Sequence, residues 1–158
     1  MTPAINTAKK AKIAHTVHEY AHDPASASYG LEASEKLGVP AARVFKTLVV
    51  RLDGRELAVG VVPVSSMLGM KQIARAAGAK KAEMAAPADV ERATGYVLGG
   101  VSPLGQKKRL RTFVDASAAD FPTIFVSAGR RGLEIELGPH DLKALTGADF
   151  ADIAQRTE

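Results

Sequence analysis

The feature that most constrains the fold is an Asp-Gly dipeptide set between two apolar, β-branched segments. Asp53-Gly54 is flanked by residues 44–52 (VFKTLVVRL) and 56–62 (ELAVGVV). Asp-Gly favours a type I′ turn, in which both central residues have positive φ and the twist suits an antiparallel strand pair. The sequence therefore predicts a β-hairpin across residues 44–62.

The rest of the chain mixes helices and strands without regular alternation. Thr2-Pro3 is typical of a helix start, and Gly38, Gly78 and Gly95 are typical of helix ends. This order is unlike that of a doubly wound parallel sheet. We therefore expect one α+β domain that spans residues 1–158. In it, helices flank a mixed, mostly antiparallel sheet or a partly closed barrel. The predicted helices are 3–14, 31–37, 71–77, 87–93 and 139–145, with a helical end at 150–154, and the other predicted strands are 15–20, 96–98, 112–115, 123–127 and 133–137.

Composition excludes several classes of protein. The chain has 158 residues, 46% hydrophobic and 24% charged, as in a folded domain rather than a disordered chain. It has no cysteine, so a disulfide, a Cys-ligated zinc ion and a Cys nucleophile are all excluded. No apolar run approaches the about 18 residues of a membrane span, and the N-terminus lacks an apolar signal segment, so we expect a cytoplasmic protein without membrane contact. The net charge of +4 permits a polyanionic partner without requiring one.

Three histidines lie close together in the sequence, at His15, His18 and His22. On a helix they would share one face and could hold a metal ion. On a strand, His15 and His18 would point to opposite faces. The β-branched and aromatic neighbours favour a strand, so we expect surface histidines and no metal site.

A glycine-rich loop precedes a basic run in residues 99–110 (GGVSPLGQKKRL). The glycines and the Ser-Pro pair make a rigid, open loop whose backbone N–H groups could hold a carbonyl or phosphate oxygen. The spacing is not that of a P-loop. The alternative is a surface turn followed by a solvated charge run.

Lys46 lies inside an apolar strand pattern. It would share a strand face with Leu48 and Val50, where an ammonium group needs an anion or a functional reason. The alternative is an edge-strand lysine whose ammonium group reaches water.

A second charged strand follows Ser127 and a glycine-containing turn. Glu134 and Glu136 alternate with apolar residues and so share one face of the strand. Paired carboxylates could perform acid–base chemistry. The alternative is the solvated face of an edge strand.

Taken together, these segments resemble the YbaK-type Cys-tRNA(Pro) deacylases, in the superfamily of the editing domain inserted in bacterial prolyl-tRNA synthetases. The resemblance runs over nearly the whole chain. Its most specific blocks are residues 94–110 (TGYVLGGVSPLGQKKRL) and 44–50 (VFKTLVV), supported by YAHDP at 20–24, KLGVP at 36–40 and RGLEIEL at 131–137.

The resemblance implies trans-editing, in which cysteine is removed from mischarged Cys-tRNA(Pro), and also from Cys-tRNA(Cys), beside prolyl-tRNA synthetase and without a cofactor or metal. The substrate's own thiol is implied to attack the ester and release a cyclic thiolactone, while the protein orients the thiol and stabilises the oxyanion. The implied catalytic residues are Lys46, Gly99 and Gly100. The implied substrate-binding residues are Tyr20, Tyr29, Thr47, Pro103, Ser127 and Glu134, and the residues expected to bind tRNA are Lys107, Lys108 and Arg109.

Two positions depart from the family pattern. Tyr29 stands where the family usually has Phe, and Glu134 stands where it usually has Asp. These changes alter reach or polarity in the amino-acid pocket. Three alternatives stay open at this stage: a deacylase for another small amino acid, such as Ala-tRNA(Pro); a non-catalytic module that binds RNA or the synthetase; and a histidine metal enzyme.

Overall fold

The predicted hairpin is the centre of the structure, a computed structural model that describes residues 1–25 and 29–155. Strands β2 (Phe45–Leu52) and β3 (Glu56–Pro63) pair antiparallel along their whole length. Asp53 and Gly54 have φ angles of 52° and 68°, as a type I′ turn requires. The hairpin is confirmed, and it positions residues 44–48 at the site described below.

The hairpin belongs to a five-stranded mixed sheet with the order β5-β2-β3-β6-β9. β5 (Ala82–Met84) pairs antiparallel with β2, whereas β6 (Arg111–Asp115) runs parallel to β3 and β9 (Asp149–Ala151) runs parallel to β6. The long connection from β3 to β6 carries helices α3 (Met70–Ala77) and α4 (Pro87–Thr94). Such a crossover is what a parallel pair requires.

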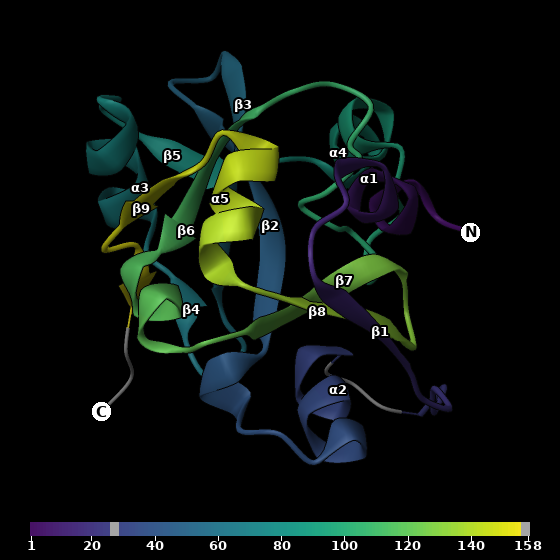
Figure 1. Ribbon diagram of the computed structural model, residues 1–158. Helices are drawn as coiled ribbons and strands as arrows, with labels where there is room; N and C mark the ends of the chain where they lie inside the picture. The colour runs from purple at the N-terminus through teal and green to yellow at the C-terminus, as the bar shows by residue number, and fades with distance from the viewer. Residues whose placement is uncertain (26–28, 156–158) are drawn as a thin grey trace.

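A second sheet has three antiparallel strands in the order β1-β8-β7 and lies against the lower part of β2 (Figure 1). These are β1 (His15–Glu19), β7 (Ile124–Arg130) and β8 (Leu133–Leu137). A short pair, β4 (Met67–Leu68) with β10 (Ala154–Gln155), completes the strands. The α+β prediction is confirmed. Within residues 1–25 and 29–155 the sheets form no closed barrel.

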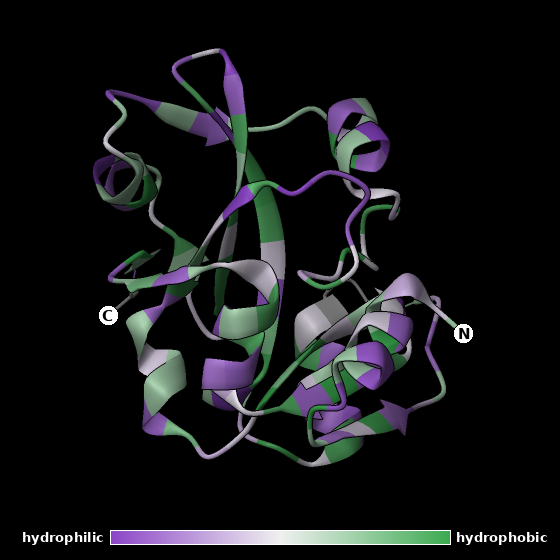
Figure 2. Cartoon of the chain, turned by 45° about the horizontal axis from the view of Figure 1, so that its top comes forward, coloured by the Kyte–Doolittle hydropathy of each residue, from purple (hydrophilic) through white to green (hydrophobic). Residues whose placement is uncertain are grey.

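The remaining helices cover the sheets. α1 (Pro3–Ala11) packs on β7, α2 (Tyr29–Leu37) contacts the short η1 turn (Ala41–Arg43), and α5 (Pro139–Thr146) contacts η2 (Ala116–Asp120). Figure 2 shows hydrophobic residues concentrated along the long central strand. Among the described residues, no helix is both long and apolar enough to cross a membrane.

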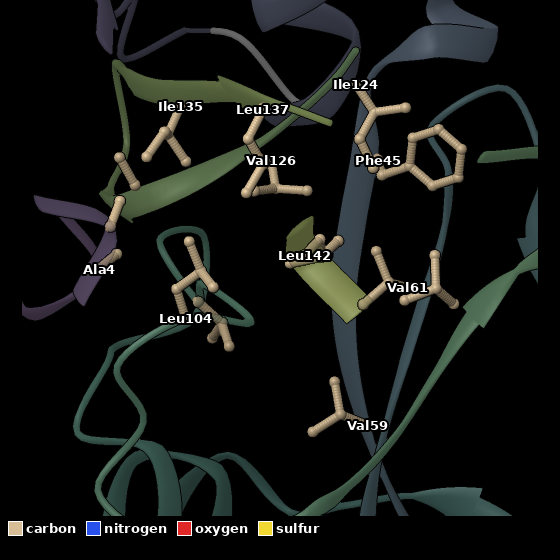
Figure 3. Packing of buried hydrophobic residues seen from close by; sticks show 14 of the residues in the cluster. Ala4, Phe45, Val59, Val61, Leu104, Ile124, Val126, Ile135, Leu137 and Leu142 are labelled. Atoms are coloured by element: carbon tan, nitrogen blue, oxygen red, sulfur yellow. The ribbon is translucent and has the colours of Figure 1, made fainter. Parts of the chain in front are cut away.

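The main hydrophobic core lies between the hairpin and the second sheet (Figure 3). Val59 and Val61 of β3 face this core, whereas Ala58 and Val62 face a second cluster beneath α3. Both faces of β3 are therefore covered, which explains its nearly continuous apolar sequence. The residues labelled in Figure 3 are Ala4, Phe45, Val59, Val61, Leu104, Ile124, Val126, Ile135, Leu137 and Leu142.

Two predicted elements were wrong in type and others in extent. The first helix ends at Ala11 rather than at residue 14, because Lys12 is left-handed (φ 57°) and its N–H donates to Lys9 O. Residues 96–98, predicted as a strand, belong to none. A turn closes just after them, where Gly100 N–H donates to Val97 O at 3.0 Å, and the hydroxyl of Tyr96 donates to Leu104 O at 2.6 Å.

Residues 150–154, predicted as helical, instead contribute to β9 and β10. The Asp115 carboxylate accepts hydrogen bonds from the N–H groups of Ile153 (3.1 Å) and Ala154 (3.0 Å). Those donors are consequently not available for a helical turn, and β6 offers the neighbouring residues a strand partner.

Candidate functional site

A cavity of about 340 Å³ opens between the hairpin and the second sheet. It is lined by residues from β2, from β7 and β8, from the start of α2 and from the loop after α4. It brings together six of the site residues predicted from the sequence, which come from distant parts of the chain: Tyr20, Lys46, Thr47, Gly99, Ser127 and Glu134.

Four consecutive residues of β2, numbers 45–48, line the cavity, so it opens along the edge of the strand rather than over one face. Val49 C=O points away from β3 and accepts from Ala85 N–H, whereas Val44 C=O points toward β3 and accepts from Val64 N–H. Because backbone groups alternate along a strand, the N–H and C=O of Thr47 point to the same side as those of Val49. β5 pairs only with residues 50–52 of β2, so it does not cover this edge.

Lys46 lies half-buried in the cavity wall. Burial lowers the pKa of its ammonium group, since the charged form is partly desolvated. No carboxylate forms an ion pair with it among the described residues. A half-buried cation of this kind is positioned to bind an anionic or carbonyl oxygen of a ligand.

The hydroxyl of Thr47 is buried and has no hydrogen-bond partner among the described residues. Buried hydroxyl groups in proteins are nearly always paired, and an exception needs an explanation such as a bound ligand. Thr47 also lines the cavity, so a ligand there would lie next to the side chain that carries this unpaired hydroxyl.

Ser127 and Glu134 lie opposite each other on β7 and β8. The register shifts after Ser127, and its Oγ accepts a hydrogen bond from Gly129 N–H at 3.2 Å. β8 is the central strand of its sheet rather than a solvated edge, and Glu134 is buried, with 7% exposure. Burial raises the pKa of Glu134 to about 8, so at neutral pH the carboxyl group is mostly protonated.

Glu136 shares the strand face of Glu134 but not its environment. It accepts hydrogen bonds from Thr123 Oγ1 at 2.6 Å and His18 Nε2 at 2.8 Å, and it is 3.3 Å from Arg43 Nη2. The hydrogen bond from Thr123 is the main reason that its pKa is lowered. The two glutamates therefore do not form an acid–base pair in one cavity.

Tyr20 closes the cavity from the end of β1, where its N–H donates to Gly132 O at 3.0 Å. The segment after it is fixed by Glu32 of α2, whose carboxylate accepts from His22 Nδ1 (3.0 Å) and Asp23 N–H (2.8 Å). Although burial opposes ionisation, these hydrogen bonds lower the pKa of Glu32. Sequence reasoning missed Glu32, since nothing local marks it as buried.

The predicted glycine loop contributes only in part to the cavity. Gly99 lines it with φ at 92°, a conformation that favours glycine. Gly100 N–H donates to Val97 O at 3.0 Å, and a Cβ at Gly100 would lie 2.8 Å from Arg130 Cα. Pro103 instead lines a separate, smaller cavity of about 210 Å³.

The three residues predicted to bind tRNA lie outside the main cavity. Lys108 and Arg109 are exposed and border the smaller cavity, and Lys107 is exposed beside Gly95. The side chain of Tyr29 lies outside the described residues. His15 and His18 are on a strand, as predicted, and among the described residues no three His, Cys, Asp or Glu side chains are grouped to hold a metal ion.

Comparison with known proteins gives a consistent match. The family described as "Aminoacyl-tRNA editing domain" matches residues 23–145, which contain every cavity residue except Tyr20. A protein of Enterococcus faecalis named "Putative Cys-tRNA(Pro)/Cys-tRNA(Cys) deacylase EbsC" is 38% identical over 98% of this chain and 94% of its own.

Solved structures share the fold at lower identity. The structure described as "Crystal structure of a putative trans-editing enzyme for prolyl tRNA synthetase" is 24% identical, with a TM-score of 0.81 over 98% of this chain and 99% of its own. That of "hypothetical protein APE2540" is 23% identical, with a TM-score of 0.85 over 97% of this chain and 99% of its own.

Proposed function

The chain belongs to the aminoacyl-tRNA editing domain family, and on that premise we propose that it acts as one deacylase domain that removes cysteine from mischarged Cys-tRNA(Pro), with Cys-tRNA(Cys) as a second substrate. The observation that carries this proposal is the single cavity that Lys46, Thr47 and Glu134 share. At about 340 Å³ it has the size of a small-ligand site, as an aminoacyl ester requires.

The biological need for such an activity follows from size. A pocket rejects a ligand poorly when that ligand fits inside it, so a synthetase built for proline admits the similarly small cysteine. A separate hydrolytic site that examines the product can then restore accuracy.

We propose that the nucleophile is the thiol of the substrate. The chain has no cysteine, and among the residues that the structure describes no histidine lines the cavity to activate Thr47 or Ser127. Glu134 is mostly protonated at neutral pH and so is a poor general base. A cysteine thiol is already partly thiolate near pH 7 and is intrinsically nucleophilic.

In the proposed step the thiolate sulfur attacks its own ester carbonyl carbon. A C–S bond forms, the C–O bond to the terminal ribose breaks, and the ribose oxygen takes a proton, which yields a thiolactone and free tRNA. Lys46 would hold a phosphate or polarise the reacting end, and the backbone N–H groups of Gly99 and Thr47 would stabilise the oxyanion. A protonated Glu134 can donate a hydrogen bond inside the cavity.

We also propose that prolyl-tRNA synthetase is a partner and that Lys107, Lys108 and Arg109 contact the tRNA phosphates. The synthetase would supply the mischarged tRNA. The three basic side chains are exposed and follow the loop whose Gly99 lines the cavity, which supports this proposal.

The test is single-turnover deacylation of Cys-tRNA(Pro) and Ala-tRNA(Pro) by wild type and by Lys46→Ala. We expect rapid release of cysteine that depends on Lys46, with alanine spared. Rapid release of alanine would replace the proposed substrate by another small amino acid and the thiol by water. Release of neither would identify a binding module instead.

A further inference from the structure

A second, more open groove of about 810 Å³ lies beside the catalytic cavity. It is bordered by β4, by the start of α3 and by the end of β5. Lys46 and Leu48 line both hollows, so the side chain of Lys46 stands where the cavity meets the groove. A ligand held at Lys46 can therefore extend directly into the groove.

The groove combines exposed thioethers with cations. Met67 and Met84 are 58% and 52% exposed, although both side chains are large and apolar. Lys71 and Arg75 lie one helical turn apart on α3 and are exposed. Neither forms an ion pair within the described residues.

Acidic side chains are absent from the groove lining among the described residues. The nearby Asp152 is engaged with Gln72, whose Nε2 donates to Asp152 Oδ1 at 3.3 Å, and Glu83 precedes Met84 on β5. The groove therefore carries an uncompensated positive charge next to polarisable apolar surface. Phosphates pair with such cations, and flat aromatic bases pack well against thioether sulfur.

We propose that this groove, defined by Met67, Met84, Lys71 and Arg75, binds the single-stranded 3′ end of the tRNA. The part that it binds is the nucleotides that precede the terminal ribose. The inference rests on the proposed function, which places the terminal aminoacyl ester beside Lys46. The nucleotides before it must leave the cavity, and the groove is continuous with it. Lys71 and Arg75 pair with phosphates, and the methionines contact bases.

The experiment compares the double variant Lys71→Ala/Arg75→Ala with wild type. A matched control, Lys9→Ala/Lys10→Ala, removes two exposed lysines from α1, which lies on the opposite side of the molecule from α3 (Figure 1). Fluorescently labelled uncharged tRNA(Pro) measures RNA binding without any chemistry. Deacylation is measured on Cys-tRNA(Pro) and on the cysteine ester of adenosine, which lacks the preceding nucleotides.

For the groove variant we expect tRNA binding to weaken roughly tenfold, and the slope of log affinity against log salt to flatten by about 1.4, because each phosphate contact on a single strand contributes about 0.7. Cleavage of the adenosine ester should stay at the wild-type rate. Met67→Ala/Met84→Ala should weaken RNA binding while leaving the salt slope unchanged.

The outcomes separate this inference from the proposed function. If the wild type cleaves both substrates and the groove variant binds tRNA with wild-type affinity and slope, the groove is not the RNA site, and a protein partner becomes the occupant to test. A weakened adenosine-ester reaction would show that the variant disturbs the cavity and would also overturn the inference. If the wild type deacylates nothing but the groove variant still loses RNA binding, the proposed function fails, whereas the groove remains an RNA-binding surface.

Discussion

Ser127 and Glu134 are direct partners across the antiparallel ladder of β7 and β8, and both line the cavity that contains Lys46. The pairing places a hydroxyl group beside a buried carboxyl group without giving the serine an ionised base. This arrangement favours chemistry in which the substrate brings its own nucleophile.

The buried carboxyl of Glu134 predicts a pH-dependent stability. Its pKa is raised by burial from 4.5 to about 8 in the folded chain, so the folded state retains a proton that the unfolded state releases. The contribution of this group to the free energy of unfolding is fully present below pH 4.5 and is lost as the pH rises through about 8. Over that range the free energy of unfolding falls by up to about 1.4 kcal/mol per pH unit.

Glu134→Gln should remove that slope, because glutamine stays neutral. As the pH rises from 5 to 9, the free energy of unfolding of the wild type should therefore fall relative to that of Glu134→Gln. Urea denaturation at several pH values measures it, with Glu91→Gln on the exposed face of α4 as the control. Parallel pH profiles for Glu134→Gln and wild type would contradict the burial argument.

Lys46→Ala should abolish deacylation while the fold persists. The side chain is half-buried and has no ion-pair partner among the described residues, so its removal leaves no orphaned charge. Loss of an electrostatic contact to the reacting end costs about a hundredfold or more in rate. Single-turnover kinetics and a thermal melt measure the two effects, with Lys10→Ala as a control. A rate within a fewfold of wild type would remove Lys46 from the proposed mechanism.

Gly100→Ala should displace the loop that reaches the cavity. A Cβ there would lie 2.8 Å from the backbone Cα of Arg130, which cannot move as a flexible side chain could. We expect a destabilisation of about 1–3 kcal/mol from the forced backbone shift, with a larger proportional loss of deacylation. Gly54→Ala, at the hairpin turn, is the control. An alanine there should cost about 1 kcal/mol of stability because the φ of residue 54 is 68°, but its added Cβ would meet no atom within 4 Å. If both variants lose the same fraction of activity, the loss reflects general destabilisation and not a role of the loop around Gly100 in the site.

Sequence patterns predicted the parts of this fold that local chemistry decides. Asp53-Gly54 specifies its own turn, Pro139 begins a helix where expected, and Gly78 and Gly95 end helices where expected. The family resemblance predicted six residues of one cavity, although they are far apart in the chain.

The parts that were missed depend on distant contacts. Residues 150–154 are extended because Asp115, far away in sequence, accepts their N–H groups. Glu32 is a surface-type residue by composition and becomes buried only where α2 meets His22 and Arg131. The groove beside Lys46 arises from β4 and β5, two short strands without a sequence signal.

The basic run after the glycine loop provides a separate test of the tRNA path. Lys107, Lys108 and Arg109 are exposed, so their combined change to alanine should not unfold the protein. If they contact duplex phosphates, tRNA affinity should fall and the salt slope should flatten by up to about 2.7, because each such contact contributes about 0.9. Salt-dependent binding of labelled tRNA(Pro) measures the slope. An unchanged slope would leave the basic run as solvated surface.

Thr47→Val tests whether the unpaired hydroxyl serves a ligand. Thr47 Oγ1 is buried without a hydrogen-bond partner among the described residues, so replacing it by a methyl group should leave the stability unchanged or slightly raise it. The control is Thr94→Val, since Thr94 Oγ1 is buried and donates to Val90 O at 2.7 Å. That variant should lose about 1–3 kcal/mol, because its partners are left unsatisfied. If the Thr47 hydroxyl binds the aminoacyl group, Thr47→Val should slow deacylation at wild-type stability. A variant that loses stability and keeps its activity would place the hydroxyl in the fold rather than in the site.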